Sequence, residues 1–325
     1  MAREAVASRV RKRLGGALIE GALTGLSRAV SLHPKVSPER HGVTVYRNIP
    51  YLGTGDAAHT LDIYQPASVR SGTPSPVCFY IHGGGFRILS KDTHWWAGLL
   101  FAAKQGYTVF NINYRLAPKH RFPAAIEDCA AALEWVLDNG KRFGADPSQL
   151  VFAGESAGAN LSLVLTLGIC YQRPEAWARS LWERCIVPKA VLPACGLLQV
   201  SDKERFSKNN QLPVWVSDRI EEICESYLPK EAMSPSSLEL ADPLLIVESG
   251  RQPVTNLPPM FLSCGGRDPV LSDTQRLELA LRAMGVECEA RYYPDGHHAF
   301  HAMLWREDAR QHWSDAFSFL SNVVG

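Results

Sequence analysis

The chain has 325 residues, of which 46% are hydrophobic and 21% are charged, and its formal net charge is +1. Such a near-neutral balance excludes the strongly basic surface typical of nucleic-acid binding, so we expect no nucleic-acid partner. The most apolar stretch, residues 161–171, contains Ser162 and Thr166 and is too short to cross a bilayer, so we expect no stable membrane insertion.

The first 40 residues are basic and carry a helical pattern of apolar side chains. They hold eight Lys/Arg against three Glu. Apolar residues recur four positions apart and predict one or two amphipathic helices: Val6, Val10, Leu14, Leu18, Ala22 and Leu26. A transit peptide or an anchor on a membrane surface has the same basic character, although Glu4 and Glu20 count against both. A helix that packs on the protein itself is the other interpretation.

Strand-like and helix-like segments alternate through the rest of the chain. Short apolar runs predict strands at 43–49, 59–64, 77–81, 108–112, 150–153, 190–193, 260–263 and 290–293. Helical patterns predict helices near 95–105, 123–139, 159–165, 217–227, 274–284 and 306–320, with Gly140 and Gly144 ending the second. The first two strands are expected to be antiparallel. Repeated strand-then-helix units predict an α/β fold with a mainly parallel sheet between layers of helices.

A glycine-flanked serine lies between the strand at 150–153 and the helix that follows it. The segment reads Gly154-Glu155-Ser156-Ala157-Gly158. A strand that turns sharply into a helix forces the residue at its apex into strained backbone torsions, so the residues two positions away must lack bulk. Gly154 and Gly158 meet that need. Ser156 is therefore the candidate nucleophile.

A glycine-rich loop follows the strand at 77–81. It reads His82-Gly83-Gly84-Gly85-Phe86. Three glycines let backbone N–H groups approach a substrate carbonyl closely, so Gly84 and Gly85, with the N–H of Ala157, are the predicted oxyanion hole. His82 and Gly83 are expected to support the loop. A phosphate-binding loop is disfavoured, because no Lys-Ser/Thr follows the glycines and no GxGxxG is present.

An acid and a base follow the serine in the chain. Asp268 comes after the strand at 260–263, and His298 comes after the strand at 290–293. The order Ser, Asp, His is that of the α/β-hydrolases. Loops that leave the carboxyl ends of parallel strands gather at one edge, so the three side chains are expected to converge. No metal is expected, because the nearby histidines lack a cysteine or carboxylate at zinc-ligand spacing.

Together these motifs resemble the hormone-sensitive-lipase-like family of carboxylesterases, from about residue 60 to the end. The segments that carry the resemblance are 82–86, 114–125, 154–158, 268–270 and 298–300. It implies an α/β-hydrolase fold with a mostly parallel eight-stranded sheet and a small helical cap. The family pattern of His, a small residue and Phe favours His298 over His297 as the base. The chain departs from the family at Glu155, Lys119, Ala159 and Ala299, where Asp, Glu, Gly and Gly are frequent.

The resemblance also implies how the chain is divided. Residues 1–45 are expected to form an N-terminal helical cap segment, and residues 46–325 the catalytic domain. The polar stretch 200–232 interrupts the strand–helix rhythm and is expected to be a cap insertion over the active site. Apolar side chains that are candidates for the substrate pocket, with ordinary packing as the alternative for each, are Phe86, Trp95, Trp96, Leu212 and Trp215.

The predicted function is that of a serine carboxylesterase acting on short- to medium-chain acyl esters through an acyl-serine intermediate, without a cofactor. The expected partner is a small-molecule ester substrate. Lipase, amidase and deacetylase activities on the same triad are alternatives, as is a non-catalytic small-ligand receptor of the same fold, such as the plant gibberellin receptor, which lacks the catalytic histidine. Activity should rise as His298 loses its proton, at about pH 6 to 7.

The eight cysteines form no CxxC pair, and several fall in apolar runs. They are expected to be small buried side chains without essential disulfides. With no apolar secretory segment at the start, we expect a cytoplasmic protein. A homodimer formed through the edge strand at 290–293 is a further expectation from the resemblance.

Overall fold

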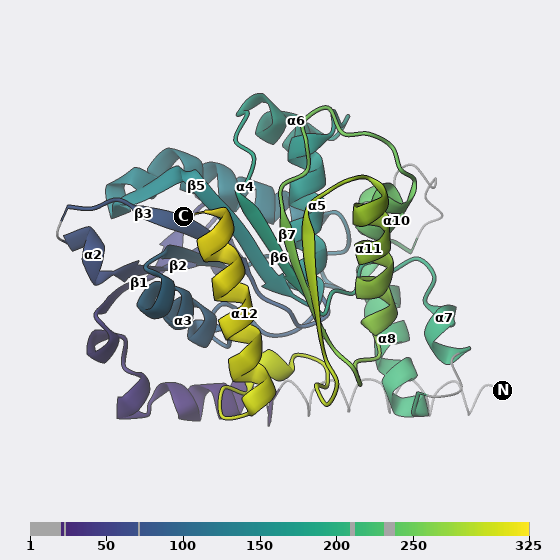
Figure 1. Ribbon diagram of the computed structural model, residues 1–325, viewed down its shortest axis with the longest axis horizontal. Helices are drawn as coiled ribbons and strands as arrows, with labels where there is room; N and C mark the ends of the chain where they lie inside the picture. Colours follow the sequence, from purple (N-terminus) through teal and green to yellow (C-terminus); the bar gives the residue numbers. More distant parts are fainter. Residues whose placement is uncertain (1–20, 23, 71, 209–211, 231–237, 325) are drawn as a thin grey trace.

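The chain folds around one eight-stranded sheet with strand order β1-β2-β4-β3-β5-β6-β7-β8 (Figure 1). The computed structural model describes residues 21–22, 24–70, 72–208, 212–230 and 238–324. The strands are β1 (Val43–Pro50), β2 (Thr60–Pro66), β3 (Ser75–Ile81), β4 (Thr108–Ile112), β5 (Ala145–Glu155), β6 (Ala190–Ala194), β7 (Met260–Gly265) and β8 (Cys288–Tyr293). Only β2 pairs antiparallel, with β1 and with β4, so the predicted mainly parallel eight-stranded sheet is confirmed.

Helices cover both faces of this sheet. In the part of the chain that the structure describes, the α-helices include α2 (Ala67–Arg70), α3 (Trp95–Gln105), α4 (Ala124–Asn139), α5 (Ala157–Cys170), α6 (Ala176–Glu183), α7 (Glu204–Ser207), α8 (Val214–Tyr227), α10 (Pro243–Glu248), α11 (Leu271–Ala283) and α12 (Glu307–Val323). Single 3-10 turns are η1 (Pro34–Val36), η2 (Pro38–His41), η3 (Ala57–His59), η4 (Gly140–Phe143), η5 (Glu239–Ala241) and η6 (Phe300–Ala302). Helices α3 and α12 lie on one face, and α4, α5, α10 and α11 lie on the other.

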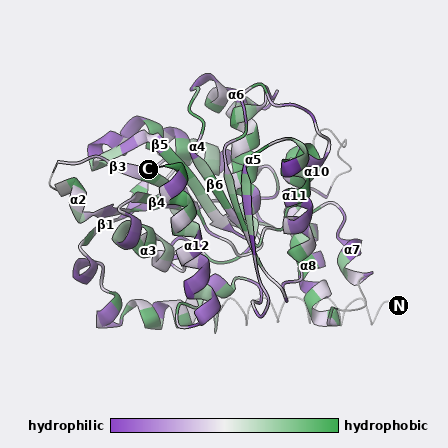
Figure 2. Cartoon of the chain, in the orientation of Figure 1, coloured by the Kyte–Doolittle hydropathy of each residue, from purple (hydrophilic) through white to green (hydrophobic). Residues whose placement is uncertain are grey.

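Strand β3 explains why the strand segments read as continuous apolar runs. Val77, Phe79 and Ile81 pack into the core on the α4 and α5 side, whereas Cys78 and Tyr80 pack into the core on the α3 and α12 side. Parallel strands covered on both faces need apolar residues at every position. The central strands are accordingly mostly hydrophobic, whereas outer helices such as α12 mix hydrophobic and hydrophilic residues (Figure 2).

Strand β5 begins earlier than the apolar run 150–153 indicates. Ala145 and Asp146 pair with Ser75 and Pro76, and the register then shifts before Val77. Because that early part of β5 is polar, the apolar pattern did not reveal it. The pairing carries β5 straight to Glu155, so the residue before Ser156 is fixed by the sheet.

The parts of the predicted cap that the structure describes lie at the edge toward which the parallel strands point (Figure 1). Residues 24–31 are helical, and α7 and α8 fall in the polar stretch 200–232. The helical pattern at Val6, Val10, Leu14 and Leu18 lies outside the described residues, as do residues 209–211 and 231–232 of the insertion. No helix in the described part of the chain has the length and apolar content to cross a membrane.

Candidate active site

The turn between β5 and α5 holds Ser156 in a strained backbone conformation. Its φ is 55° and its ψ is −115°, a region that residues other than glycine rarely adopt. A Cβ on Gly158 would lie 2.0 Å from the carbonyl oxygen of Ile81, so only glycine fits there. The Ser156 N–H donates to the carbonyl oxygen of Ala194 at 2.9 Å, which ties the turn to β6.

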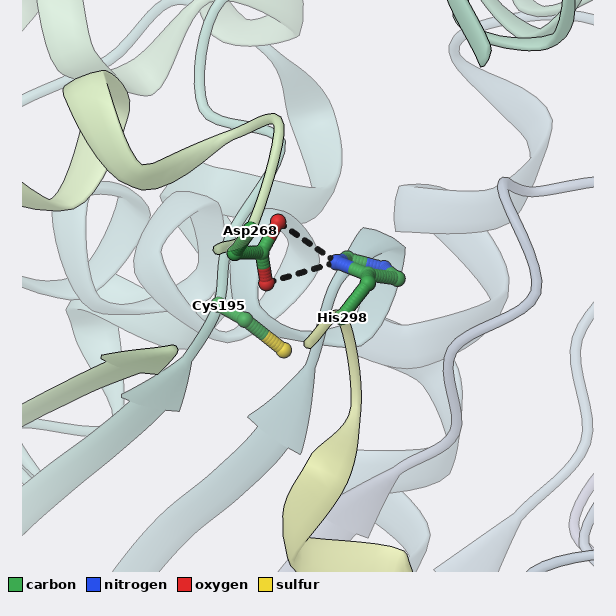
Figure 3. Close-up of side chains that lie close together, drawn as sticks. All are labelled: Cys195, Asp268 and His298. Carbon is green, nitrogen blue, oxygen red and sulfur yellow. Dashed lines mark hydrogen bonds and ion pairs between the residues drawn. The ribbon is translucent and has the colours of Figure 1, made fainter. Parts of the chain in front are cut away.

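The structure brings Ser156, His298 and Asp268 together from three separate loops. The Ser156 Oγ lies 3.0 Å from His298 Nε2. His298 Nδ1 lies 3.0 and 2.9 Å from the two carboxylate oxygens of Asp268 (Figure 3). Asp268 is buried and also accepts the N–H of Val270 at 3.0 Å, whereas the His298 side chain is 38% exposed. The order hydroxyl, imidazole, carboxylate is the one that nucleophilic acyl transfer requires.

Electrostatics around His298 favour its protonated form. Burial would lower the pKa of the imidazole, but the charge of Asp268, its hydrogen bond and the charge of Glu155 outweigh burial and raise the pKa above its ordinary value. A base of this kind holds a developing positive charge well. The consequence is that the neutral, proton-accepting imidazole predominates only at a higher pH than for a free histidine.

We therefore expect kcat/KM for a neutral ester to rise with pH along a limb centred above the free-histidine pKa of about 6.5. Only the neutral form of His298 can accept the serine proton. A raised pKa therefore moves the limb to higher pH and makes kcat/KM low in mild acid. Hydrolysis of p-nitrophenyl acetate from about pH 5 to about pH 9 measures this limb. A flat profile, or a limb centred below the free-histidine value, would contradict the assignment of His298 as the base.

The glycine loop approaches the same site from the end of β3. Gly84 has a φ of 110°, and a Cβ there would lie 2.1 Å from the carbonyl oxygen of Ile88, so the loop needs glycine. The Gly84 carbonyl accepts the N–H groups of Arg87 and Ile88, both at 3.1 Å. Within the described residues, the N–H groups of Gly84, Gly85 and Ala157 donate no hydrogen bond to protein. Such unpaired donors are what an oxyanion hole presents.

His82 is fixed inside the loop. Its Nδ1 donates to the Gly83 carbonyl at 2.6 Å, and its own carbonyl accepts the Tyr114 hydroxyl at 2.9 Å. The rings of His82 and Tyr114 stack at 4.3 Å. Burial, followed by the charge of His94, lowers the pKa of His82 to about 3. His82 therefore stays neutral at ordinary pH and is suited to loop support.

Sequence patterns did not identify the contact between α8 and the glycine loop. A Cβ on Gly85 would lie 2.7 Å from Cδ1 of Ile223, so that side chain covers the loop closely. The Phe86 ring stacks on Tyr227 with centroids 3.7 Å apart. Ile223 and Tyr227 are four residues apart and therefore share one face of a helix. Their spacing on the predicted helix is the sequence signal that could have indicated this contact.

The residues predicted to line the pocket lie in different surroundings. Phe86 is fully buried, Leu212 is half-buried on the main core, and Trp215 is 64% exposed. Trp95 is buried, with its indole N–H donating to Ser27, and Trp96 packs against Tyr80, His94, His301 and Trp313. Within the described part of the chain, no hydrogen bond or ring contact joins any of the five to Ser156 or His298.

One group of side chains at the site has the composition of a metal centre. The Cys195 thiol, the Asp268 carboxylate and the His298 imidazole have ligand atoms within 4.8 Å of one another (Figure 3). Burial and then the charge of Asp268 raise the pKa of Cys195 well above its ordinary value, whereas zinc binds the thiolate. His298 Nδ1 is already engaged by Asp268. The group therefore fits a serine triad with a neutral thiol beside it better than a metal site.

Asp273 follows the candidate acid by five residues and resembles a helix-capping residue in the sequence. In the structure it lies in the first turn of α11, whose N-cap is Val270 and has no side-chain cap hydrogen bond. The Asp273 carboxylate instead accepts the N–H groups of Leu198 and Gln199 at 2.8 and 3.2 Å and pairs with Arg205 at 2.8 Å. Asp273 therefore fixes the loop that follows β6, and Cys195 lies in that loop.

The chain is similar in sequence and in fold to known proteins. A family model described as alpha/beta hydrolase fold matches residues 78–302. The chain is 30% identical over 277 residues to carboxylesterase NlhH of Mycobacterium tuberculosis, covering 84% of this chain and 79% of that protein. It is 29% identical over 241 residues to the acetyl esterase of Salmonella typhi, covering 73% and 70%. The structure of esterase LipW from Mycobacterium marinum matches with a TM-score of 0.73 at 23% identity, over 95% and 90% of the two chains, which supports the fold.

Proposed function

We propose that this chain, which belongs to the hormone-sensitive-lipase-like family of α/β-hydrolases and is a carboxylic ester hydrolase, cleaves small-molecule esters through an acyl-Ser156 intermediate. The observation that carries the serine mechanism is the contact of 3.0 Å between Ser156 Oγ and His298 Nε2 on a strained turn. A strained serine in contact with an imidazole is the arrangement that activates a hydroxyl.

The proposed cycle uses this chain's side chains and no cofactor. His298 Nε2 accepts the Ser156 proton as Oγ attacks the ester carbonyl, and Asp268 keeps the other ring nitrogen protonated. The N–H groups of Gly84, Gly85 and Ala157 stabilise the oxyanion. His298 then protonates the departing alcohol, and the same imidazole activates the water that hydrolyses the acyl-enzyme.

We propose that residues 1–45 and 200–232 act as a cap on the catalytic domain of residues 46–325. Support comes from contacts of both segments with the site region. Glu222 of α8 pairs at 3.1 Å with Arg87, the residue directly after the glycine loop. The Ser27 hydroxyl donates to the Thr93 carbonyl at 2.9 Å. Closure of a cap over the nucleophile would shape the acyl pocket and limit the entry of water.

We propose a preference for short- to medium-chain acyl groups. Ile223 lies directly against Gly85, where a branched side chain leaves little room beside an oxyanion donor. Lipase, amidase and deacetylase activities remain the alternatives on the same triad. A series of p-nitrophenyl esters from acetate to palmitate, with the matching anilides, separates these activities. Highest kcat/KM on the longest ester would favour the lipase.

Labelling with a fluorophosphonate, followed by peptide mapping, tests the serine mechanism directly. We expect one adduct, on the peptide that contains Ser156, and loss of p-nitrophenyl butyrate turnover in step with labelling. Modification of a different residue would show that the nucleophile is elsewhere. Absence of both labelling and turnover would favour a non-catalytic receptor of the same fold, the alternative that the presence of His298 disfavours.

We also propose a cytoplasmic location and a homodimer. All eight cysteines are unpaired, and six of them are buried, which suits a reducing compartment. β8 is the last strand in the sheet order and is only partly covered, so its edge can pair with a second copy. Cell fractionation and light scattering of the pure protein test these two statements.

A further inference from the structure

A buried carboxylate lies directly before the candidate nucleophile. Glu155 is 3% exposed. Its Oε1 accepts the Gly83 N–H at 2.6 Å and lies 2.6 Å from His94 Nε2, and its Oε2 accepts the Tyr80 hydroxyl. Burial of a carboxylate is costly unless it is paired and hydrogen-bonded, and both conditions hold here. Glu155 takes no part in the proton transfers of the serine mechanism described above, although its charge contributes to raising the pKa of His298.

We propose that Glu155 and His94 form a buried positioning pair that holds the glycine loop against the nucleophile turn and so aims the oxyanion donors. The inference rests on the proposed serine mechanism and names two residues that would act through the oxyanion hole without touching substrate. Glu155 joins the two parts of that hole, because it binds Gly83 of the loop and is followed by Ser156 and Ala157.

The loop and the turn meet without space between them. A Cβ on Gly83 would lie 2.7 Å from Glu155 Oε1 and 2.8 Å from its carbonyl oxygen. The Gly83 N–H donates to Glu155 Oε1 at 2.6 Å, so the carboxylate and the loop are in direct contact. Gly84 and Gly85 follow immediately, so a displacement of Glu155 passes directly to their N–H groups. Misplacement of a reacting group by about 1 Å can cost about a hundredfold in rate.

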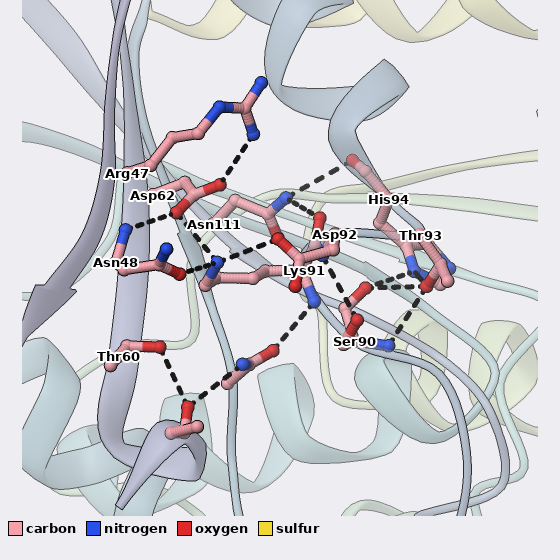
Figure 4. Close-up of polar contacts among 12 residues, drawn as sticks. Arg47, Asn48, Thr60, Asp62, Ser90, Lys91, Asp92, Thr93, His94 and Asn111 are labelled. Atoms are coloured by element: carbon pink, nitrogen blue, oxygen red, sulfur yellow. Dashed lines mark hydrogen bonds and ion pairs between the residues drawn. The ribbon is translucent and has the colours of Figure 1, made fainter. Parts of the chain in front are cut away.

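His94 is held in place independently of Glu155. Its Nδ1 lies 2.9 Å from the Thr93 hydroxyl and 3.1 Å from the Ser90 carbonyl. The amide of Asn111, a buried residue of β4, donates to the carbonyl oxygens of His94 at 3.3 Å and of Lys91 at 3.0 Å (Figure 4). The imidazole is thus fixed by the sheet and by its own loop before it meets the carboxylate.

A second buried ion pair anchors that loop to the antiparallel end of the sheet. Lys91 and Asp62 are both fully buried, with Lys91 Nζ 2.8 Å from Asp62 Oδ1. Lys91 Nζ also donates to Asn48 at 2.7 Å and to Asp92 at 2.9 Å (Figure 4). Hydrogen bonds and ion pairs inside a protein are stronger than in water, so this network holds residues 90–94 against the sheet. Contacts therefore run without a break from β2 through residues 90–94 to Glu155.

The charges of the pair support each other at neutral pH. Burial would raise the pKa of Glu155 and lower that of His94, but their mutual charge and hydrogen bond outweigh it. The pKa of Glu155 falls to about 2, and that of His94 rises above its ordinary value. Two further histidines face this region, and burial lowers the pKa of His82 to about 3 and of His301 to about 4. Their low pKa values favour the neutral form of both, whereas the raised pKa of His94 favours the charged form that pairs with Glu155.

Substitution of Glu155 by Gln tests the pair with little change in volume. We expect kcat for p-nitrophenyl acetate to fall by roughly 10- to 100-fold while KM changes by less than about threefold, because oxyanion hydrogen bonds strengthen in the transition state. Affinity for a trifluoromethyl ketone, which forms a tetrahedral adduct with serine, should fall by a similar factor. His94→Gln should act in the same direction, and the two changes together should cost less than the product of the separate losses.

Thr108→Val is the matched control. The Thr108 hydroxyl lies 2.5 Å from that of Ser75 in a buried pair at the N-terminal ends of the parallel strands β3 and β4, whereas the glycine loop follows the C-terminal end of β3. We expect it to lower Tm without changing kcat. If Glu155→Gln and His94→Gln likewise lower Tm but keep the wild-type kcat and inhibitor affinity, the pair is structural and the inference is overturned. Wild-type protein that is not labelled at Ser156 would instead overturn the proposed serine mechanism.

Discussion

Replacement of Ser156 by alanine is expected to lower kcat for p-nitrophenyl acetate by roughly 10⁴-fold or more. The hydroxyl is the atom that would form the acyl bond, and its contact of 3.0 Å with His298 Nε2 would supply the proton acceptor. Alanine leaves the oxyanion donors and the binding surface intact, so only the residual catalysis that these provide should remain. Steady-state kinetics, with a circular dichroism spectrum to confirm the fold, measure the loss.

Ser162→Ala provides the matched control for that change. Ser162 is fully buried in α5, and its hydroxyl donates to the Gly158 carbonyl at 2.8 Å, away from the hydroxyl–imidazole contact. Loss of that hydrogen bond should cost about 1 kcal/mol of unfolding free energy and leave kcat within a fewfold of wild type. Near-normal turnover by Ser156→Ala would show that another group is the nucleophile.

The sheet could be predicted because its signal is local. Apolar residues on consecutive positions, as in β3, occur where both faces of a parallel strand are covered. The first residues of β5 were missed because Ala145 and Asp146 are held by pairing with Ser75 and Pro76, and their own sequence is polar. α2, α6 and α10 are too short for helical periodicity to stand out.

In the site, too, the features that could be predicted were those with a local sequence signal. Gly158 and Gly84 were predictable because a turn and a close backbone approach each exclude a side chain at one position. Contacts between distant segments carry no such signal. Sequence patterns named Glu155 without showing whether it is buried or solvated, and they gave no indication of His94. Trp95 and Trp96 of α3 were candidates for the pocket, with ordinary packing as the alternative, because aromatic side chains fit a pocket or a core equally well.

A second large effect is expected at the acid of the triad, where Asp268→Asn should lower kcat by about 10⁴-fold with little change in KM. Both Asp268 oxygens accept from His298 Nδ1, at 3.0 and 2.9 Å, which leaves Nε2 unprotonated and able to accept the serine proton. An amide that turns its nitrogen toward Nδ1 would favour the other tautomer. Nε2 would then carry the proton and could no longer act as a base. Kinetics at a pH above the limb of the wild-type enzyme measure this effect.

Asp273→Asn distinguishes that tautomer effect from the loss of a buried carboxylate. Asp273 is buried like Asp268 and binds Arg205 and the N–H groups of Leu198 and Gln199, but among the described residues no hydrogen bond or ion pair joins it to His298. Its replacement should lower Tm and leave most of kcat, since it removes a loop anchor and leaves the imidazole tautomer unchanged. Equal losses of kcat in both variants would mean that Asp268 acts only by holding its loop. A loss confined to Asp268→Asn would assign to that carboxylate the orientation and the charge of the His298 ring.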